Sequence, residues 1–121
     1  MTEELRYFKN RRKFARANIY AIMRFLCPLL KSAVVVQTRI SDISEGGVTM
    51  VAFKDPLPSE ATLEMSFVMP GPKGQLVTVG GKVKYTRIVE KDLYQSGVEF
   101  LKLEKKDQLT IREYVASQSK K

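Results

Sequence analysis

The stretch LEMSFVMPGPKGQLVTVGGKVKYTR, residues 63–87, decides the fold, because apolar and polar residues alternate along most of it. Successive side chains of a β-strand point to opposite faces, so this alternation predicts strands that are buried on one side. The apolar faces consist of Leu63, Met65, Phe67 and Met69 in the first run and Val77, Val79, Val83 and Tyr85 in the second. Between the runs, PGPKGQ (residues 70–75) has the prolines and glycines of a hairpin loop. The stretch therefore predicts an antiparallel pair of strands.

The remainder of the chain predicts more strands and then one helix. Further strands are expected at residues 18–26, 34–42, 47–53 and 94–101. Gly80–Gly81 lies inside a strand pattern, which predicts a bulge or a barrel bend there. The last segment, EKKDQLTIREYVASQSKK, has the composition of a helix with one apolar stripe, from which Leu109 is excluded. The stripe consists of Ile111, Tyr114 and Val115. We therefore expect an all-β fold, a small six-stranded antiparallel β-barrel with a C-terminal α-helix.

The charge of the chain is unevenly distributed. The 121 residues carry a net charge of +8, and 44% of them are hydrophobic, which suits one globular domain. Residues 1–32 contain eight Lys or Arg residues and two acidic ones, Glu3 and Glu4. Such asymmetry indicates an anionic partner, whether nucleic acid, a nucleotide or a membrane surface. A solvated basic face is the alternative.

Cysteine and histidine usage excludes several classes of protein. The chain has one cysteine, Cys27, and no histidine. It therefore has no internal disulfide, no Ser-His or Cys-His pair and no zinc-ligand spacing, so we expect neither an enzyme nor a metal site. No apolar run is long enough to span a membrane, and the start MTEELRYFKN does not resemble a signal peptide. We expect a cytoplasmic protein.

A dense cluster of cations lies near the start of the chain, in RRKFAR (residues 11–16). Three of its four cations are arginines: Arg11, Arg12 and Arg16. The planar guanidinium group binds phosphate with two parallel hydrogen bonds and stacks on rings, which lysine does less well. The cluster indicates a ligand that carries phosphate.

A second cluster of polar residues follows the strand expected at 34–42, in DISEGG (residues 42–47). Asp42 and Ser44 are two residues apart, so on an extended backbone they point to the same side. Gly46 and Gly47 would let the backbone turn sharply and let a ligand approach the amide groups. A carboxylate beside a hydroxyl suits the N–H donors of guanine, and arginine suits its O6 and N7 acceptors. An ordinary Asx or Ser turn before a Gly-Gly bend is the alternative.

Taken together, the two clusters resemble the motifs of the PilZ domain family. Arg12 and Arg16 form R-x-x-x-R, and Asp42, Ser44 and Gly47 form D-x-S-x-x-G. GVEFLKL (residues 97–103) is similar to the last barrel strand of that family, and the resemblance covers roughly residues 6–117. It implies a stand-alone PilZ-like domain in which residues 1–17 form a flexible basic arm. Residues 18–121 would form the barrel and the helix.

The resemblance implies a receptor for cyclic di-GMP, a bacterial second messenger. Arg12 and Arg16 would bind its phosphates and guanine faces, and Asp42 and Ser44 would bind a guanine edge. Gly46 and Gly47 complete the expected site, Gly47 by keeping the turn open. Arg11 occupies the position that influences stoichiometry in similar domains, so two ligands per domain are expected. The ligand would order the arm, and an unidentified protein partner would recognise the resulting surface.

Two other functions are compatible with the sequence. A small basic β-barrel can bind nucleic acid, although we expect no exposed aromatic residues on its strand faces, and Phe14 is most simply an anchor for the arm. A PilZ-type domain can also serve as a protein adaptor that binds no ligand. Such family members usually lack the arginines or the Asp-Ser pair, both of which this chain has.

Overall fold

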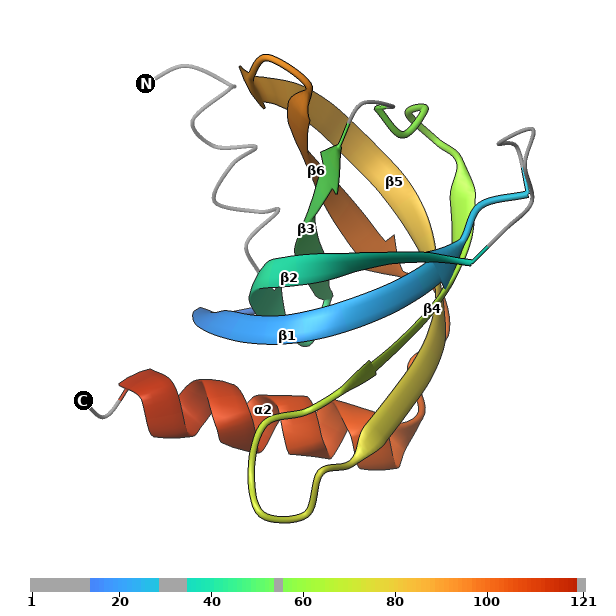
Figure 1. The fold of residues 1–121 in the computed structure, drawn as a ribbon. Coiled ribbons are helices and arrows are strands. Elements are labelled where there is room, and N and C mark those ends of the chain that lie inside the picture. Colours follow the sequence, from blue (N-terminus) through green and yellow to red (C-terminus); the bar gives the residue numbers. More distant parts are fainter. Residues whose placement is uncertain (1–13, 29–34, 54–55, 120–121) are drawn as a thin grey trace, which may run out of the picture.

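Six antiparallel strands close into a barrel, and one helix follows them (Figure 1). The computed structural model describes residues 14–28, 35–53 and 56–119. The strands are β1 (Arg16–Leu26), β2 (Val36–Ser44), β3 (Gly47–Phe53), β4 (Thr62–Val68), β5 (Leu76–Glu90) and β6 (Leu93–Phe100), and the helix is α2 (Lys105–Ser119). Their order around the barrel is β1-β2-β3-β6-β5-β4, and β4 pairs with β1 to close it. The predicted all-β barrel with a C-terminal helix is confirmed.

The hairpin predicted from residues 63–87 is formed by β4 and β5. Phe67 pairs with Val77 and Met65 pairs with Val79, and these apolar side chains point into the barrel. The prediction that Tyr85 shares this face is wrong, because the register shift between Val83 and Tyr85 turns its half-buried ring to the outer surface beside Gly97. In the loop, the N–H of Met69 donates to the carbonyl of Gln75 at 2.9 Å. Gly71 and Gly74 have φ angles of 133° and 53°, which explains why this loop needs glycine.

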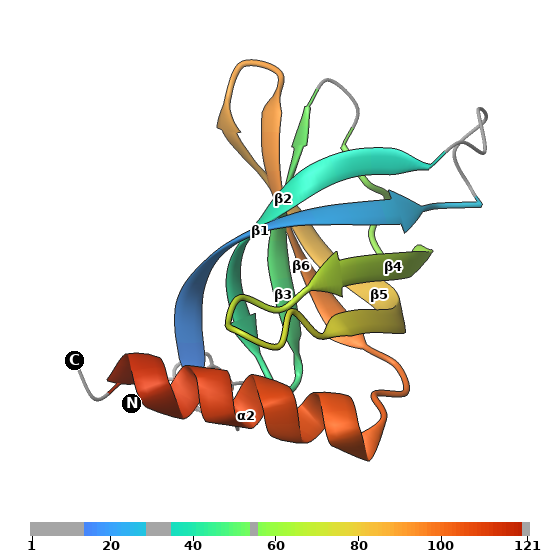
Figure 2. The same ribbon diagram turned by 60° about the horizontal axis from the view of Figure 1, so that its bottom comes forward.

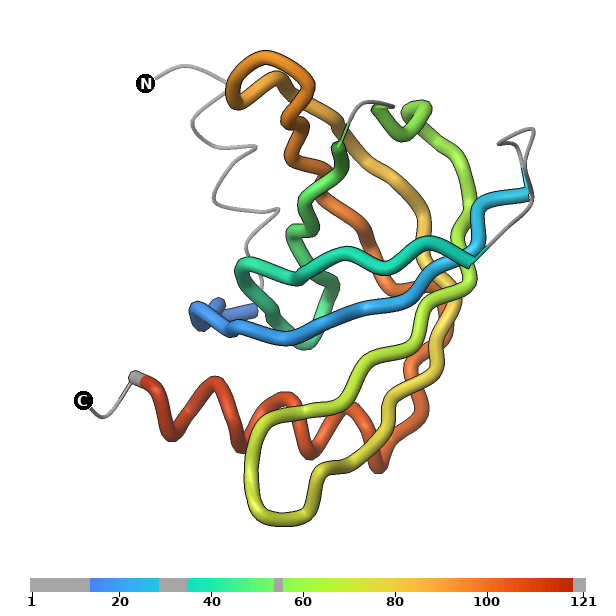
Figure 3. The backbone as a smooth tube through the Cα atoms, in the orientation of Figure 1, coloured from blue at the N-terminus to red at the C-terminus, as the bar shows by residue number. Residues whose placement is uncertain are grey.

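Alternation in the other strands supplies the rest of the core. In β1 each second residue from Ala17 to Phe25 is buried, while the residues between them are exposed. The largest side chains with almost no exposed surface are Phe67, Met23, Ile40, Ile43 and Met50. Because these residues come from β1, β2, β3 and β4, the core lies inside the closed barrel, whose backbone is traced in Figure 3.

The irregularity expected at Gly80–Gly81 lies further along β5. Both glycines pair in regular register with β4, and the register shifts occur between Val83 and Tyr85 and between Ile88 and Glu90. Of the two predicted alternatives at the glycines, the bulge is therefore wrong, and the barrel bend stays a prediction. A Cβ on Gly81 would lie 2.5 Å from Val98 and 2.6 Å from Met65, so the missing side chain makes room for the core instead.

Helix α2 lies along one end of the barrel, beside the start of β1 and the β4–β5 loop (Figure 2). The predicted stripe is confirmed, since Ile111 and Val115 are buried and Tyr114 is half-buried, whereas Leu109 is exposed. The side chain of Gln75 donates to Asp107 at 2.6 Å, and the hydroxyl of Tyr114 donates to the carbonyl of Asn18 at 3.0 Å. Among the described residues, no helix has the length and apolar character needed to cross a membrane.

Candidate ligand-binding site

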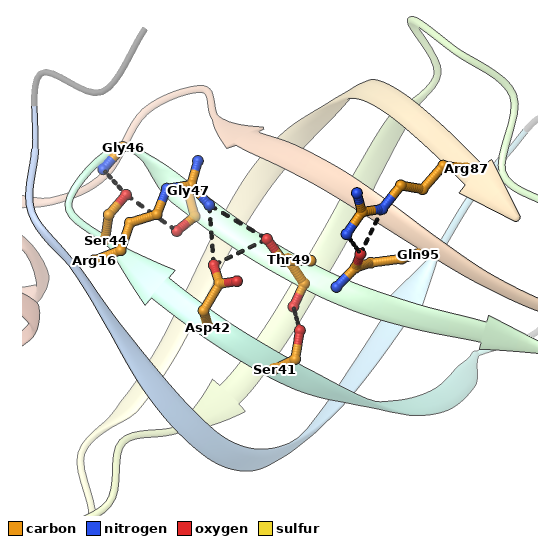
Figure 4. Close-up of polar contacts among 9 residues, drawn as sticks. All are labelled: Arg16, Ser41, Asp42, Ser44, Gly46, Gly47, Thr49, Arg87 and Gln95. Carbon is orange, nitrogen blue, oxygen red and sulfur yellow. Dashed lines mark hydrogen bonds and ion pairs between the residues drawn. The ribbon is translucent and has the colours of Figure 1, made fainter. Parts of the chain in front are cut away.

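The structure brings Arg16 from the arginine cluster and Asp42 from the DISEGG cluster into direct contact (Figure 4). Arg16 is the first residue of β1, and its Nη1 donates to Oδ1 of Asp42 at 3.0 Å and to Oγ1 of Thr49 at 3.3 Å. The hydroxyl of Thr49 also donates to Oδ1 of Asp42, at 2.9 Å. Antiparallel pairing explains the contact, because Asp42 of β2 lies opposite Asn18 of β1 and opposite Thr49 of β3.

Ser44 lies on the same side of β2 as Asp42, but its hydroxyl forms hydrogen bonds within the β2–β3 turn. The buried Ile43 between them points into the core. The Oγ of Ser44 accepts a hydrogen bond from the N–H of Gly46 at 3.1 Å and donates to the carbonyl of Gly47 at 3.5 Å. This is the Ser turn that the sequence left open as an alternative. Asp42 is therefore the more available of the two acceptors.

Gly46 and Gly47 are constrained by packing, since neither has the positive φ of a left-handed turn. A Cβ on Gly47 would lie 2.0 Å from the carbonyl oxygen of Val98, so β6 passes too closely for any side chain. A Cβ on Gly46 would lie 3.1 Å from the ring of Phe14. Phe14 thus packs on the β2–β3 turn, and its expected role as an anchor for the arm stays a prediction because residues 1–13 lie outside the described residues.

Arg11 and Arg12 lie outside the described residues, so their expected roles stay predictions. The same holds for residues 1–13 of the expected flexible arm (residues 1–17), whereas Arg16 and Ala17 belong to β1, which begins two residues before the boundary expected from the sequence. The structure therefore describes five of the expected site residues: Arg16, Asp42, Ser44, Gly46 and Gly47.

Sequence reasoning missed Thr49, which bonds both Arg16 and Asp42. The number of residues between Asp42 and Thr49 could have indicated that they pair. Glu45 and Gly46 form a two-residue turn, and β2 continues to Ser44, two residues beyond the predicted end at residue 42. A two-residue hairpin turn fixes the register of its strands, which places residue 49 opposite residue 42.

Sequence reasoning also missed Glu45, which joins the β2–β3 turn to α2. Its Oε1 accepts hydrogen bonds from Nη2 of Arg112 at 3.0 Å, from Nε of Arg112 at 3.2 Å and from Gln108 at 3.1 Å. Arg112 and Gln108 are four residues apart and thus share one face of the helix. Only 14% of the Glu45 side chain is exposed. The hydrogen bonds from Arg112 hold the pKa of Glu45 below its ordinary value of 4.5, against the opposing effect of burial.

The lowered pKa predicts how acid affects the attachment of α2. A carboxylate whose pKa is lower in the folded than in the unfolded state stabilises the fold above the unfolded pKa, and this contribution is lost as the pH falls through the folded pKa. We therefore expect Glu45→Gln to lower the melting temperature at pH 7, with a difference from wild type that shrinks as the pH falls below 4.5. Thermal unfolding of both proteins between pH 7 and pH 3 measures it. A difference that stays constant over that range would exclude an ionic role for Glu45.

Two aromatic side chains are exposed on the strands, contrary to expectation. Tyr20 on β1 is 76% exposed and Phe53 at the end of β3 is 70% exposed. Tyr20 occupies an outward position between the buried Ile19 and Ala21, and the guanidinium carbon of Arg39 lies 5.7 Å from its ring centroid. The expectation that strand faces carry no exposed aromatic residue is therefore wrong, because the alternation of β1 places Tyr20 outside the barrel.

The chemistry of the site suits an organic anion. Arg16 offers a partly exposed guanidinium group, and Asp42 has a second carboxylate oxygen that accepts no hydrogen bond from the described residues. The described part of the chain contains no group of three or more potential metal ligands. Cation and carboxylate side by side can bind a ligand that has both acceptors, such as phosphate oxygens, and N–H donors.

Comparison with known proteins relates the chain to one family. The family model described as PilZ domain matches residues 10–117. Comparison with curated proteins yields no matching sequence.

Three solved structures illustrate the similarity of fold. The inhibitor of motility MotI/DgrA of Bacillus subtilis aligns with a TM-score of 0.76 and 15% identity over 90% of this chain and 51% of its own. The PilZ domain of YcgR from Escherichia coli, with c-di-GMP, aligns with a TM-score of 0.69 and 13% identity over 91% of this chain and 92% of its own. The K. pneumonia MrkH–c-di-GMP complex aligns with a TM-score of 0.69 and 22% identity over 88% of this chain and 51% of its own. The chain thus spans about half the length of the MotI/DgrA and MrkH chains.

Proposed function

The chain belongs to the PilZ domain family, and from this premise we propose that it is a receptor for cyclic di-GMP. The single observation that carries the proposal is the contact between Arg16 and Asp42. These residues come from two short motifs 26 positions apart, and antiparallel pairing of β1 with β2 brings their side chains into contact. Two motifs on opposite sides of the barrel could not bind the same small molecule.

The ligand and the site are chemically complementary. Cyclic di-GMP has two phosphates and two guanines, so it requires cations for the phosphates, acceptors for the guanine N–H groups and donors for O6 and N7. Arg16 supplies a fork of N–H donors, and the second oxygen of Asp42 is an acceptor for the guanine edge. Arg12 would provide a second guanidinium group, and Ser44 and the amides of Gly46 and Gly47 would border the base.

The free energy of binding would come largely from charged hydrogen bonds. Each such bond contributes about 1.5–3 kcal/mol, and micromolar affinity corresponds to about 8 kcal/mol. Several contacts are therefore required, and part of their free energy is lost in ordering the arm. An arm that is mobile without ligand and ordered with it would change the charge and shape of the surface beside Asp42. We propose that this surface binds the protein partner, since cyclic di-GMP binding by itself produces no chemical output.

The Glu45 contact offers a path from the site to the helix. Glu45 lies between Ser44, which borders the site, and Gly46, on which Phe14 rests. Through Arg112 and Gln108 it holds α2. A ligand that moves the β2–β3 turn would therefore strain these contacts, and the surface of α2 could change together with the arm.

One observation favours a second function. The exposed ring of Tyr20 beside Arg39 resembles the stacking platforms of proteins that bind single-stranded nucleic acid, and the chain is basic. Binding of this kind weakens steeply with salt and does not depend on guanine. The two functions therefore differ in a measurable way.

Isothermal titration of the full chain with cyclic di-GMP tests the proposal. We expect saturable binding in the micromolar range, with two ligands per chain because Arg11 precedes the arginine motif. Cyclic di-AMP, which lacks the guanine donors and acceptors, is the matched control and should bind at least tenfold more weakly. Equal affinity for both ligands, or no binding of either, would contradict the proposal. Tight, salt-sensitive binding of an arbitrary DNA oligonucleotide alone would support the second function.

A further inference from the structure

The outer surface next to Asp42 continues across two further strands onto β5. Asp42 on β2 pairs with Thr49 on β3, Thr49 pairs with Gly97 on β6, and Gly97 pairs with Tyr85 on β5. These four residues form one row across the sheet. Adjacent strands are about 4.8 Å apart, so the row is about 14 Å long. The proposed function uses only Asp42, the first position of the row.

Gly97 and Tyr85 give this row an aromatic end. A Cβ on Gly97 would lie 2.2 Å from Cε2 of Tyr85, so the half-buried ring lies directly over the glycine. Between Thr49 and β5, the row therefore carries no side chain except this ring. A ring that is partly accessible, as that of Tyr85 is, can stack with a base, because every base has a π-face.

The next row along the same face carries a cation. Gln95 on β6 pairs with Val51 on β3 and with Arg87 on β5. Nε of Arg87 donates to Oε1 of Gln95 at 2.7 Å, and its Nη2 donates to the same oxygen. Figure 4 shows Arg87 and Gln95 beyond Thr49, on the face that carries Arg16 and Asp42.

Arg87 differs from the arginines whose charge is already paired. Arg16 contacts Asp42 and Arg112 contacts Glu45, whereas the exposed guanidinium group of Arg87 is held by a neutral amide. Within the described ranges, no carboxylate lies within ion-pair distance of Arg87. Gln95 thus orients the planar fork without neutralising its charge, which favours binding of an anion.

We propose that the ligand surface extends across β3 and β6 to Tyr85 and Arg87. In this arrangement Arg87 binds a phosphate or the O6/N7 edge of a guanine at the end remote from Asp42, and the Tyr85 ring supports the base. This inference rests on the proposed function and specifies its ligand. One nucleotide cannot reach from Asp42 to Arg87, whereas a dinucleotide, or two dinucleotides stacked together, can. Arg87 therefore selects ligands with two nucleotides.

Calorimetry of Arg87→Ala with cyclic di-GMP and with GMP tests the extension. Loss of one charged hydrogen-bonding group predicts a rise of about tenfold in the Kd for cyclic di-GMP, or a fall from two ligands to one. The weak affinity for GMP should stay unchanged. Arg24→Ala is the matched control, because Arg24 is also an exposed arginine on an outward strand position with no ion-pair partner among the described residues, but it lies near the other end of β1.

The outcomes separate the extension from the proposed function. If wild type and Arg24→Ala bind cyclic di-GMP equally and Arg87→Ala binds it about tenfold more weakly, or binds one ligand in place of two, the extension is supported. If all three bind within twofold of each other and with the same number of ligands, the extension is wrong and the receptor function stands. If wild type does not bind, the receptor function itself fails. Arg87→Lys, which retains the charge and loses the fork, is the second variant should Arg87→Ala prove unstable, and it should fall between the two.

Discussion

Arg16→Ala abolishes measurable binding of cyclic di-GMP, whereas Arg24→Ala leaves the affinity of the wild type. This is the expected result if Arg16 joins the two motifs in one site. Its guanidinium group contacts Asp42 and Thr49 and is partly exposed, so it can bind a phosphate without leaving the site. Its removal also deletes the cation that orients Asp42. Arg12→Ala is expected to have the same effect from a position outside the described residues.

The loss of binding should not reflect unfolding. The side chains of Arg16 and Asp42 are 41% and 25% exposed, and ion pairs this exposed contribute about 0–1 kcal/mol to stability. After the substitution, Asp42 retains the hydrogen bond from Thr49. We therefore expect the melting temperature of Arg16→Ala to lie within a few degrees of that of the wild type. Near-normal affinity in calorimetry would exclude Arg16 from the site.

The barrel could be predicted because the alternation of apolar and polar residues within each strand indicates which of its faces is buried. Alternation up to Val83 indicated both faces of the hairpin, and PGPKGQ indicated the loop, where Gly71 and Gly74 have positive φ. Tyr85 was assigned to the wrong face because the register shift between Val83 and Tyr85 cannot be read from the alternation. The bulge was misplaced because the sequence pattern does not distinguish a glycine needed by the backbone from one needed by the core. Gly81 belongs to the second kind, since its Cβ would collide with Met65 and Val98.

The site could be predicted only in part, because its contacts join residues far apart in sequence. The motif residues were recognised from their resemblance to a family, and pairing of β1 with β2 then brings Arg16 to Asp42. Nothing local marked Glu45 as a partner of Arg112, which is 67 residues away. The position of Arg87 beside the site could not be predicted either, because it depends on the order of β3, β6 and β5 in the barrel.

Gly47→Ala should destabilise the barrel even without ligand. The resemblance to the family implies that Gly47 keeps the turn open for the base, but in the structure its Cβ would lie 2.0 Å from the carbonyl oxygen of Val98. That oxygen belongs to the backbone of β6, which pairs with β3 and cannot move aside without breaking the ladder. Overpacking of this kind costs about 1–3 kcal/mol, which corresponds to a fall of roughly 5–15 °C in the melting temperature.

Gly46→Ala is the matched control for this prediction, because it makes the same chemical change one residue earlier in the turn. Its Cβ would lie 3.1 Å from the partly exposed ring of Phe14, which can shift, so its stability should stay within about 0.5 kcal/mol of wild type. Thermal unfolding of both variants without ligand decides between the two roles of Gly47. If Gly47→Ala had the melting temperature of the wild type yet failed to bind cyclic di-GMP, the glycine would be needed for ligand binding. The close approach of β6 would then not explain why the motif has glycine at this position.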